Sequence, residues 1–327
     1  MSEFCTKDLI SEAKKAVADA SYSPKKLALI HTGIAAGVSL VLTLLTYFLD
    51  AGIGNTGGLS GIGNRALLET AQSVLQLAAT VLSPFWALGF VAVALNLGYR
   101  RDVDGNTLLS GMRRWGPALR MFLLQGLIYF VVMMVAVQIG SFVYTMTPAS
   151  AQLQTLLEEL LEAGAADADA MTVLLESLDE ATMTKIVLSM LPFLLIPMAL
   201  LLIPVAYRMR LAQYILMDEP RCGALFAITL SFRLTKGNCL KLLKLDLHYW
   251  WYYGLELLVT LVAFGDLLLP LLGVSLNMSA EIAAIVFYVL TLFGQLALYA
   301  WKKPQVFTSY ALFYDSLLPK EQPEMEL

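Results

Sequence analysis

Glu256 has the clearest potential for chemistry, because it lies in the middle of the apolar stretch 245–265. A stretch of about this length is what a helix needs to cross a 30 Å hydrocarbon core. An unpaired carboxylate at that depth costs several kcal/mol, so we expect Glu256 to be protonated or hydrogen-bonded. Tyr252 and Tyr253 lie on the same helix face, and Gln295 in a later apolar stretch is a candidate partner across helices. We expect no lysine or arginine at matching depth.

Two functions fit such a carboxylate. An ionisable residue inside a membrane is by default a hypothesis for a proton-linked or cation-linked site. A polar side chain that fastens two helices together explains it equally well. The pattern around Glu256 favours the fastener and leaves the transport hypothesis open.

Other reactive groups are few. Asp246 and His248 lie at one end of the same stretch, but a metal site needs further His or Cys ligands, and the only other histidine is His31. The aromatic run 249–253 is better explained as a belt at the level of the lipid headgroups. The sequence contains no nucleophile elbow, HExxH, paired CxxC or nucleotide-binding fingerprint. We therefore expect no catalytic residue, no metal or other cofactor, and no nucleic-acid partner.

Six apolar runs supply the helices that would position Glu256. Of all residues 58% are apolar and 15% are charged, whereas soluble domains carry about 25% charged residues. The composition predicts an all-α polytopic membrane protein with six transmembrane helices. The runs lie at about 27–49, 70–97, 119–145, 184–206, 245–265 and 281–301.

Basic residues gather on alternate connections between these runs. Of the 22 lysines and arginines, only Arg65 and Lys185 lie on the remaining connections. The positive-inside rule therefore predicts that both termini are cytoplasmic. The three cysteines, Cys5, Cys222 and Cys239, fall on the same side, where thiols stay reduced, so no disulfide is expected. The basic segments are 1–26, 98–120, 207–244 and 302–327.

The cytoplasmic segments combine apolar stripes with basic residues, as helices at a membrane interface do. We expect an N-terminal amphipathic segment 1–26, a membrane domain 27–303 and an amphipathic tail 304–327. Two inner connections, 102–118 and 219–237, repeat the pattern. In the second, Leu225, Ile228 and Phe232 should face lipid or the helix bundle, with Arg221, Arg233 and Lys236 toward the headgroups.

The outer connections carry weaker signals. The first repeats Gly-Ile-Gly-Asn within 51–64, but no Lys-Ser/Thr follows it, so a turn is favoured over a phosphate-binding loop. The second, at about 146–184, carries eight acidic residues and apolar residues at helical spacing. A solvated acidic loop with two short helices is favoured there over a metal site.

Two motifs in the last 120 residues resemble those of a bacterial membrane family. The first begins with the run Tyr-Ile-Leu-Met-Asp-Glu-Pro, and the second closes the chain. They are similar to motifs of a family catalogued as a domain of unknown function, number nine hundred and seventy-five, found mostly in Gram-positive bacteria. Thr235 and the run after His248 depart from the family pattern. The first motif comprises Asp218, Pro220, Ser231, Lys236, Gly237 and Asn238. The second comprises Pro304, Phe313 and Tyr314.

The resemblance implies six spans in a bacterial plasma membrane. It does not indicate any particular activity. We expect a non-enzymatic integral membrane protein that binds or moves lipid or a small amphipathic molecule, or that modulates a membrane partner. The alternative is a proton- or cation-coupled transporter that uses Glu256. A groove open to lipid would favour the first function, and a closed polar path through Glu256 the second.

Overall fold

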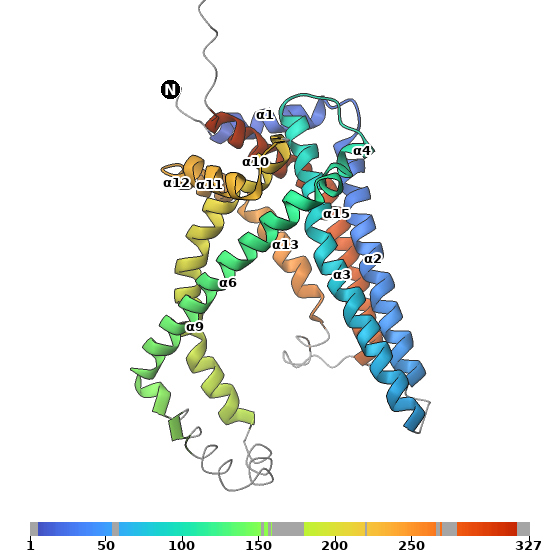
Figure 1. Cartoon of the computed structure of the whole chain (residues 1–327), viewed down its shortest axis with the longest axis vertical. Coiled ribbons are helices and arrows are strands. Elements are labelled where there is room, and N and C mark those ends of the chain that lie inside the picture. The colour runs from blue at the N-terminus through green and yellow to red at the C-terminus, as the bar shows by residue number, and fades with distance from the viewer. Residues whose placement is uncertain are drawn as a thin grey trace, which may run out of the picture. The chain divides into compact units, whose positions relative to one another are not determined.

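The computed structural model describes residues 6–53, 59–151, 154–155, 158, 180–219, 221–265, 269 and 280–318. In this part of the chain every regular element is helical, as the composition predicted. Most of the acidic connection, Cys5 and Pro220 lie outside the described residues. The chain divides into two compact units (Figure 1), and each is described by itself. The first comprises Met1–Phe122 with Leu211–Leu327, and the second comprises Leu123–Arg210.

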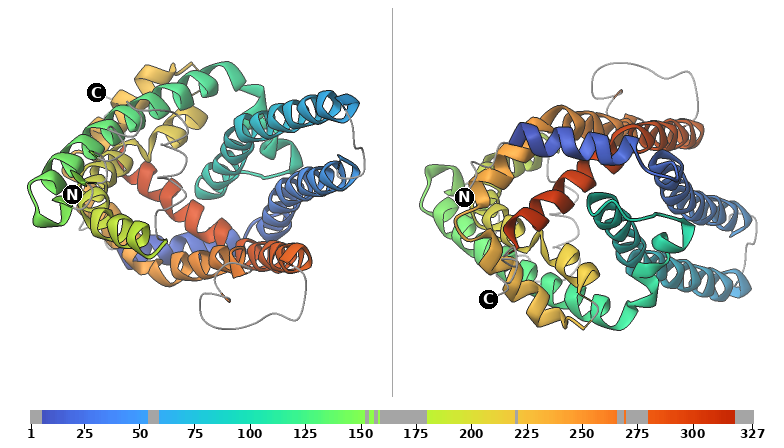
Figure 2. Two further views of the ribbon diagram at one scale, coloured as in Figure 1. Left: turned by 90° about the horizontal axis from the view of Figure 1, so that it is seen from below. Right: turned by 90° about the horizontal axis from the view of Figure 1, so that it is seen from above.

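Three long helices, α2, α3 and α15, pack side by side in the first unit (Figures 1 and 2). Leu27, Phe90, Val93 and Leu108 are almost fully buried in the core at one end of this group. The helices of the first unit are α1 (Thr6–Ala18), α2 (Pro24–Ile53), α3 (Leu59–Gly98), α4 (Gly105–Leu108), α5 (Ser110–Arg113), the start of α6 (Trp115–Thr145), α10 (Ala212–Asp218), α11 (Ala224–Thr235), α12 (Cys239–His248), α13 (Trp250–Val262) and α15 (Ala280–Leu317).

A left-handed residue ends α3. Arg100 has a φ of 53°, and the backbone N–H of Arg101 donates to the Asn96 carbonyl at 2.8 Å. This 6→1 bond is the helix-ending motif in which a left-handed residue closes the last turn. Tyr99 therefore lies at a sharp reversal of the chain, where its side chain leaves the helix.

The inner connection 102–118 packs on α3 instead of lying free at an interface. A Cβ added to Gly89 would be 1.8 Å from the Leu108 carbonyl oxygen, and one added to Gly111 would be 2.2 Å from the Phe85 oxygen. Only glycine allows backbones to approach this closely. The structure thus covers part of the predicted apolar stripe, at Val103, Leu108 and Ala118, and leaves Leu109, Met112 and Trp115 exposed.

The tail is a continuation of α15. This helix runs from Ala280 to Leu317 with Pro304 inside it, so the boundary expected between 303 and 304 falls within one element. Phe313 and Tyr314 are 0% and 2% exposed. The apolar face of the tail therefore packs in the core of the unit. The N-terminal helix α1 likewise packs against α15 and α3, with Leu9 and Ala13 buried.

The stretch 245–265 is not one helix. It is divided at Tyr249, whose φ and ψ of −97° and 14° end α12 and precede α13. The 13 residues of α13 span about 20 Å, which is too short to cross a 30 Å core alone. Tyr249 and Tyr252 in this run are buried, whereas Trp250 is exposed, so the break accompanies inward packing of the tyrosines.

In α11 the predicted stripe is divided between two faces. Ile228 is buried with Ala227 and Ser231, and this face packs against α10. Leu225 and Phe226 are 69% and 56% exposed. Of the three apolar residues predicted to face lipid or the helix bundle, Ile228 is buried, Phe232 is half-buried and Leu225 is exposed.

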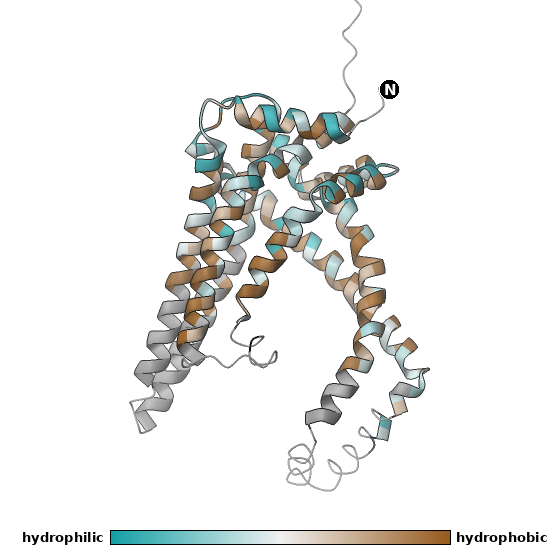
Figure 3. Ribbon diagram, turned by 180° about the vertical axis from the view of Figure 1, so that it is seen from behind, coloured by the Kyte–Doolittle hydropathy of each residue, from teal (hydrophilic) through white to brown (hydrophobic). Residues whose placement is uncertain are grey.

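The second unit pairs α6, from Leu123 onward, with α9 (Glu180–Met209). A Cβ on Gly140 would be 2.4 Å from the Phe193 oxygen, so the two backbones touch at this point. Tyr144 and Ser189 hydroxyls form a hydrogen bond of 3.0 Å beside it. The short 3₁₀ helix Pro148–Ser150 follows α6. Most of the described length of α9 is coloured hydrophobic in Figure 3.

Three stretches of the described residues are long and apolar enough to cross a membrane, fewer than the six predicted. The second predicted span qualifies only as a shorter apolar helix over Leu82–Gly98, and the fifth is divided at Tyr249. The structure thus supports a membrane protein with at least some spanning helices. The three stretches are Trp115–Thr145, Leu188–Asp218 and Ile285–Leu317.

Candidate functional site

Glu256 lies on α13 and is hydrogen-bonded across to α15. The Tyr299 hydroxyl donates to Glu256 Oε1 at 2.6 Å. Gln295, the predicted partner, lies one turn before Tyr299 on the same helix and is half-buried. The partner across helices is therefore a phenol in place of an amide, and the hydrogen bond joins α13 to α15.

A lysine lies beside this pair, which contradicts the expectation that no basic residue shares the depth of Glu256. The Lys303 ammonium is 4.4 Å from the centre of the Tyr299 ring and acts electrostatically on Glu256. Phe90 and Phe307 also lie near this ammonium, at 5.3 and 5.7 Å from their ring centres. Because side chains lean toward the N-terminus of their helix, Lys303 reaches back over the turn that carries Tyr299.

The tyrosines near Glu256 bind α15 instead of facing headgroups. The Tyr253 hydroxyl is 2.6 Å from that of Tyr310, and Tyr310 donates to Asp246. Tyr249 pairs with Ser309 at 2.8 Å. Tyr252 is 2% exposed, and within this run Trp250 alone is strongly exposed, at 70%. The predicted aromatic belt is therefore wrong for the tyrosines, which form a polar seam between the two helices.

The two family motifs meet at Asp218. The hydroxyls of Tyr99 and Tyr314 both donate to Asp218 Oδ2, each at 3.1 Å. Burial raises the pKa of Tyr99, and the neighbouring Asp218 carboxylate raises it further. The Asp-Glu-Pro motif and the closing Phe-Tyr motif are thus two sides of one contact, and Tyr99 is a third member that the sequence did not single out.

Arg114, the residue that follows α5, contacts the same region from another segment of the chain. Its guanidinium donates to the carbonyls of Leu216 and Met217 at 2.6 and 3.1 Å. These are carbonyls of the last turn of α10, which have no partner within the helix. A cation at a helix C-terminus is also favoured by the helix dipole. Arg114 thereby orients the turn that carries Asp218. We call these four residues, Tyr99, Arg114, Asp218 and Tyr314, the Asp218 junction.

The remaining motif residues shape the turn between α11 and α12. Ser231 is fully buried, and its carbonyl accepts from the Thr235 hydroxyl at 2.7 Å. Gly237 has a φ of 79°, a conformation that favours glycine. Asn238 donates from its side chain to the Leu234 carbonyl at 3.0 Å, and Lys236 is exposed. These residues explain the motif as a helix-ending turn. Pro304 is buried within α15.

His31 is buried against α3. Its ring stacks on Trp86 with centres 5.3 Å apart, and Trp86 Nε1 donates to the His31 carbonyl at 2.8 Å. Within the described residues, no group of three or more His, Cys, Asp or Glu side chains is arranged to hold a metal ion.

The second unit contains an apolar groove of about 490 Å³ between α6 and α9. Gly126, Tyr129, Phe130 and Met133 supply one side, at the spacing i, i+3, i+4 and i+7. This spacing is the only feature of the sequence that could have indicated the groove. It does not distinguish a groove wall from an ordinary lipid-facing stripe. The other side consists of Leu202, Ile203 and Ala206.

Comparison with known proteins agrees with the motifs. Neither a curated protein nor a solved structure matches the chain. A family model described as a protein of unknown function, DUF975, matches residues 25–321, which is most of the sequence. The chain therefore belongs to the DUF975 family.

Proposed function

We propose that this chain is a non-enzymatic integral membrane protein that binds a lipid or a small amphipathic molecule in the groove between α6 and α9. The groove carries the proposal, because its described lining is almost wholly apolar. Phe130 and Ile203 on its walls are each 54% exposed. An acyl chain is the occupant that matches a long apolar wall on helices able to cross a membrane.

A polar group at one end suits an amphipathic ligand. Tyr129 lines the groove and interacts electrostatically with Arg210. The guanidinium is also 6.0 Å from the centre of the Tyr207 ring. An anionic headgroup beside Arg210 with its chain along Phe130 and Met133 would satisfy both ends of the ligand.

For the membrane arrangement we propose six helices with both termini in the cytoplasm of a bacterial cell. Two observations support this proposal. The helices α2 and α3 have 30 and 40 residues, each long enough for a membrane crossing. Twenty of the 22 basic residues lie on alternate connections.

For Glu256, we propose a structural role as a fastener between α13 and α15. The 2.6 Å bond from Tyr299 and the polar seam around it support this role. Proton- or cation-coupled transport through Glu256 remains the alternative function.

Filling the groove tests the main proposal. A Cβ added to Gly126 meets no atom within 4 Å, so Gly126→Leu should place a side chain in the groove without strain. We expect the wild-type protein to keep a bound lipid through detergent exchange, detected by native mass spectrometry. The Gly126→Leu protein should lose most of it.

Gly116→Leu is the matched control. Gly116 lies on the same helix, a Cβ there also meets no atom within 4 Å, and it does not line the groove. Both variants replace a glycine of α6 by leucine and so add the same apolar side chain. Equal lipid retention by the Gly126→Leu and Gly116→Leu proteins would contradict the proposal, as would a wild-type protein that retains no lipid.

A further inference from the structure

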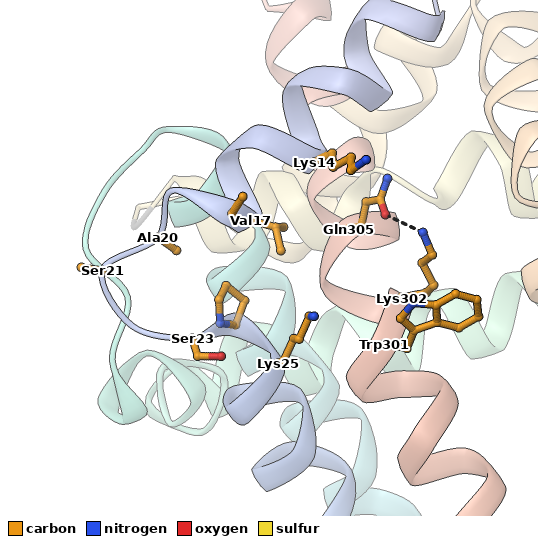
Figure 4. A pocket seen from close by; sticks show the side chains of 11 residues that line it. Lys14, Val17, Ala20, Ser21, Ser23, Lys25, Trp301, Lys302 and Gln305 are labelled. Carbon is orange, nitrogen blue, oxygen red and sulfur yellow. Dashed lines mark hydrogen bonds between the residues drawn. The ribbon is translucent and has the colours of Figure 1, made fainter.

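A second cavity, of about 590 Å³, lies in the first unit where α1, α2 and α15 meet (Figure 4). It is lined by the end of α1, by the turn Ala20–Pro24 and by one turn of α15. Three lysines from three helices, Lys14, Lys25 and Lys302, are among its walls. No carboxylate is among the described residues that line it.

Two of the lysines act electrostatically on the third. Lys14 and Lys25 both interact electrostatically with Lys302. Figure 4 shows Lys14 and Lys302 beside Gln305, and Lys25 extends from α2. Lys302 donates to Gln305 Oε1 at 3.1 Å, which uses one of its three N–H donors. Like charges this close repel, so an anion between them would relieve an unfavourable interaction.

The N-terminus of α2 and a serine hydroxyl also face the cavity. Pro24 and Lys25 begin the 30-residue helix α2, so the positive end of its dipole faces the cavity. Ser23 contributes a hydroxyl to the wall. The Ser21 hydroxyl, which also lines the cavity, donates to the Asp102 carboxylate at 2.9 Å. Asp102 thus has a hydrogen-bond donor and is not itself among the lining residues.

Indole rings form the remaining wall. Trp301 lines the cavity and is 56% exposed, and Lys302 lies 5.2 and 5.4 Å from the centres of the Trp301 and Trp251 rings. Tryptophan concentrates at the membrane–water interface, where phosphate headgroups lie. Three cations, a helix N-terminus and an exposed indole together favour a phosphate group that carries an apolar or aromatic attachment.

We propose that the cavity lined by Lys14, Lys25, Lys302 and Trp301 binds a phosphate-bearing anion. The phosphate belongs either to an anionic lipid headgroup or to a soluble phosphoester. This site lies in the first unit and does not depend on the groove between α6 and α9.

The test uses the full chain in phosphatidylcholine nanodiscs and follows tryptophan fluorescence. One arm titrates pyrophosphate, and the other titrates short-chain phosphatidic acid into the bilayer. We expect a saturable change in at least one arm that Trp301→Phe abolishes. A response to phosphatidic acid alone assigns a lipid, and a response to pyrophosphate alone assigns a soluble ligand. Either response supports the site, and a lack of response in both arms overturns it.

Neighbouring lysines provide a matched control. Lys14→Gln with Lys25→Gln should weaken binding about 25-fold, at about fivefold for each lysine. Lys15→Gln with Lys26→Gln removes the same charge from adjacent exposed positions that do not line the cavity, and should have little effect. All four side chains are exposed, so both proteins should fold. Equal weakening by the two double variants would show a general surface charge effect and would overturn the proposal.

Discussion

The Asp218 junction predicts a measurable loss of stability when its acceptor is removed. Asp218→Ala leaves the hydroxyls of Tyr99 and Tyr314 without their acceptor, and Tyr314 is 2% exposed. Hydrogen bonds to charged groups contribute about 1.5–3 kcal/mol each. Both bonds are 3.1 Å long, against about 2.5–2.7 Å for a strong O–H···O⁻ bond, so each belongs at the lower end of that range. We therefore expect Asp218→Ala to lower the free energy of unfolding by about 3 kcal/mol.

Single tyrosine variants divide this loss. Tyr314→Phe should cost about 1–1.5 kcal/mol, because it removes one bond but leaves Asp218 a second donor in Tyr99. Asp218→Asn keeps an acceptor and should cost less than Asp218→Ala. Tyr22→Phe is the control, since Tyr22 is 41% exposed. Unfolding of the purified protein in mixed detergent micelles gives these free energies. If the effects of Asp218→Ala and Tyr314→Phe simply add in the double variant, the two side chains are not coupled and the reasoning is refuted.

The junction also predicts the direction of pH dependence. The pKa of Tyr99 is raised in the folded protein, first by burial and then by Asp218. A raised pKa means that the contribution of Tyr99 to stability is complete below the unfolded value of about 10 and is lost as pH rises above it. The wild-type melting temperature should therefore fall more steeply above pH 10 than that of Tyr99→Phe. Parallel melting curves of the two proteins would contradict this prediction.

Glu256→Gln keeps an acceptor for Tyr299 and should change stability by less than about 1 kcal/mol; a folded variant that loses pH-dependent transport in proteoliposomes would instead establish the transport function. Gly89→Ala should lower the free energy of unfolding by about 1–3 kcal/mol, because its Cβ would be 1.8 Å from the Leu108 carbonyl oxygen. This loss should exceed the gain in helix propensity. An unchanged melting temperature would refute the contact. Burial and the charge of Glu219 raise the pKa of the Cys222 thiol, so this thiol should react slowly with maleimide at neutral pH. In the proposed topology Cys222 is cytoplasmic, so an impermeant reagent outside intact cells should not label it. External labelling would contradict that topology.

The sequence predicted helices well, because long apolar runs leave few alternatives. It failed where two elements pack together. Nothing in the run around Tyr249 signals that its hydroxyl pairs with Ser309, and that packing accompanies the break between α12 and α13. The expected tail begins at residue 304, yet α15 continues through Pro304, and most of the residues that follow in the helix are buried.

The candidate sites show the same limit. Counting residues along one helix placed Glu256 in an apolar segment but could not identify Tyr299 or Lys303, which belong to another helix. The family motifs pointed to Asp218 and Tyr314 as separate features. The hydrogen bond from Tyr314 to Asp218 is visible only in the folded chain, since 96 residues separate the two in sequence.

The continuity of α15 has a mechanical consequence. One continuous helix carries Tyr299, Lys302 and Tyr314, and Pro304, a residue that kinks helices, lies between Lys302 and Tyr314. Residues 299 and 314 are about 22 Å apart along the helix path. A movement of this helix that brings Lys302 toward an anion would also shift both tyrosines relative to their carboxylates. Occupancy of the lysine cavity and integrity of the Asp218 junction would then be linked reciprocally, so that loosening one must change the affinity measured at the other.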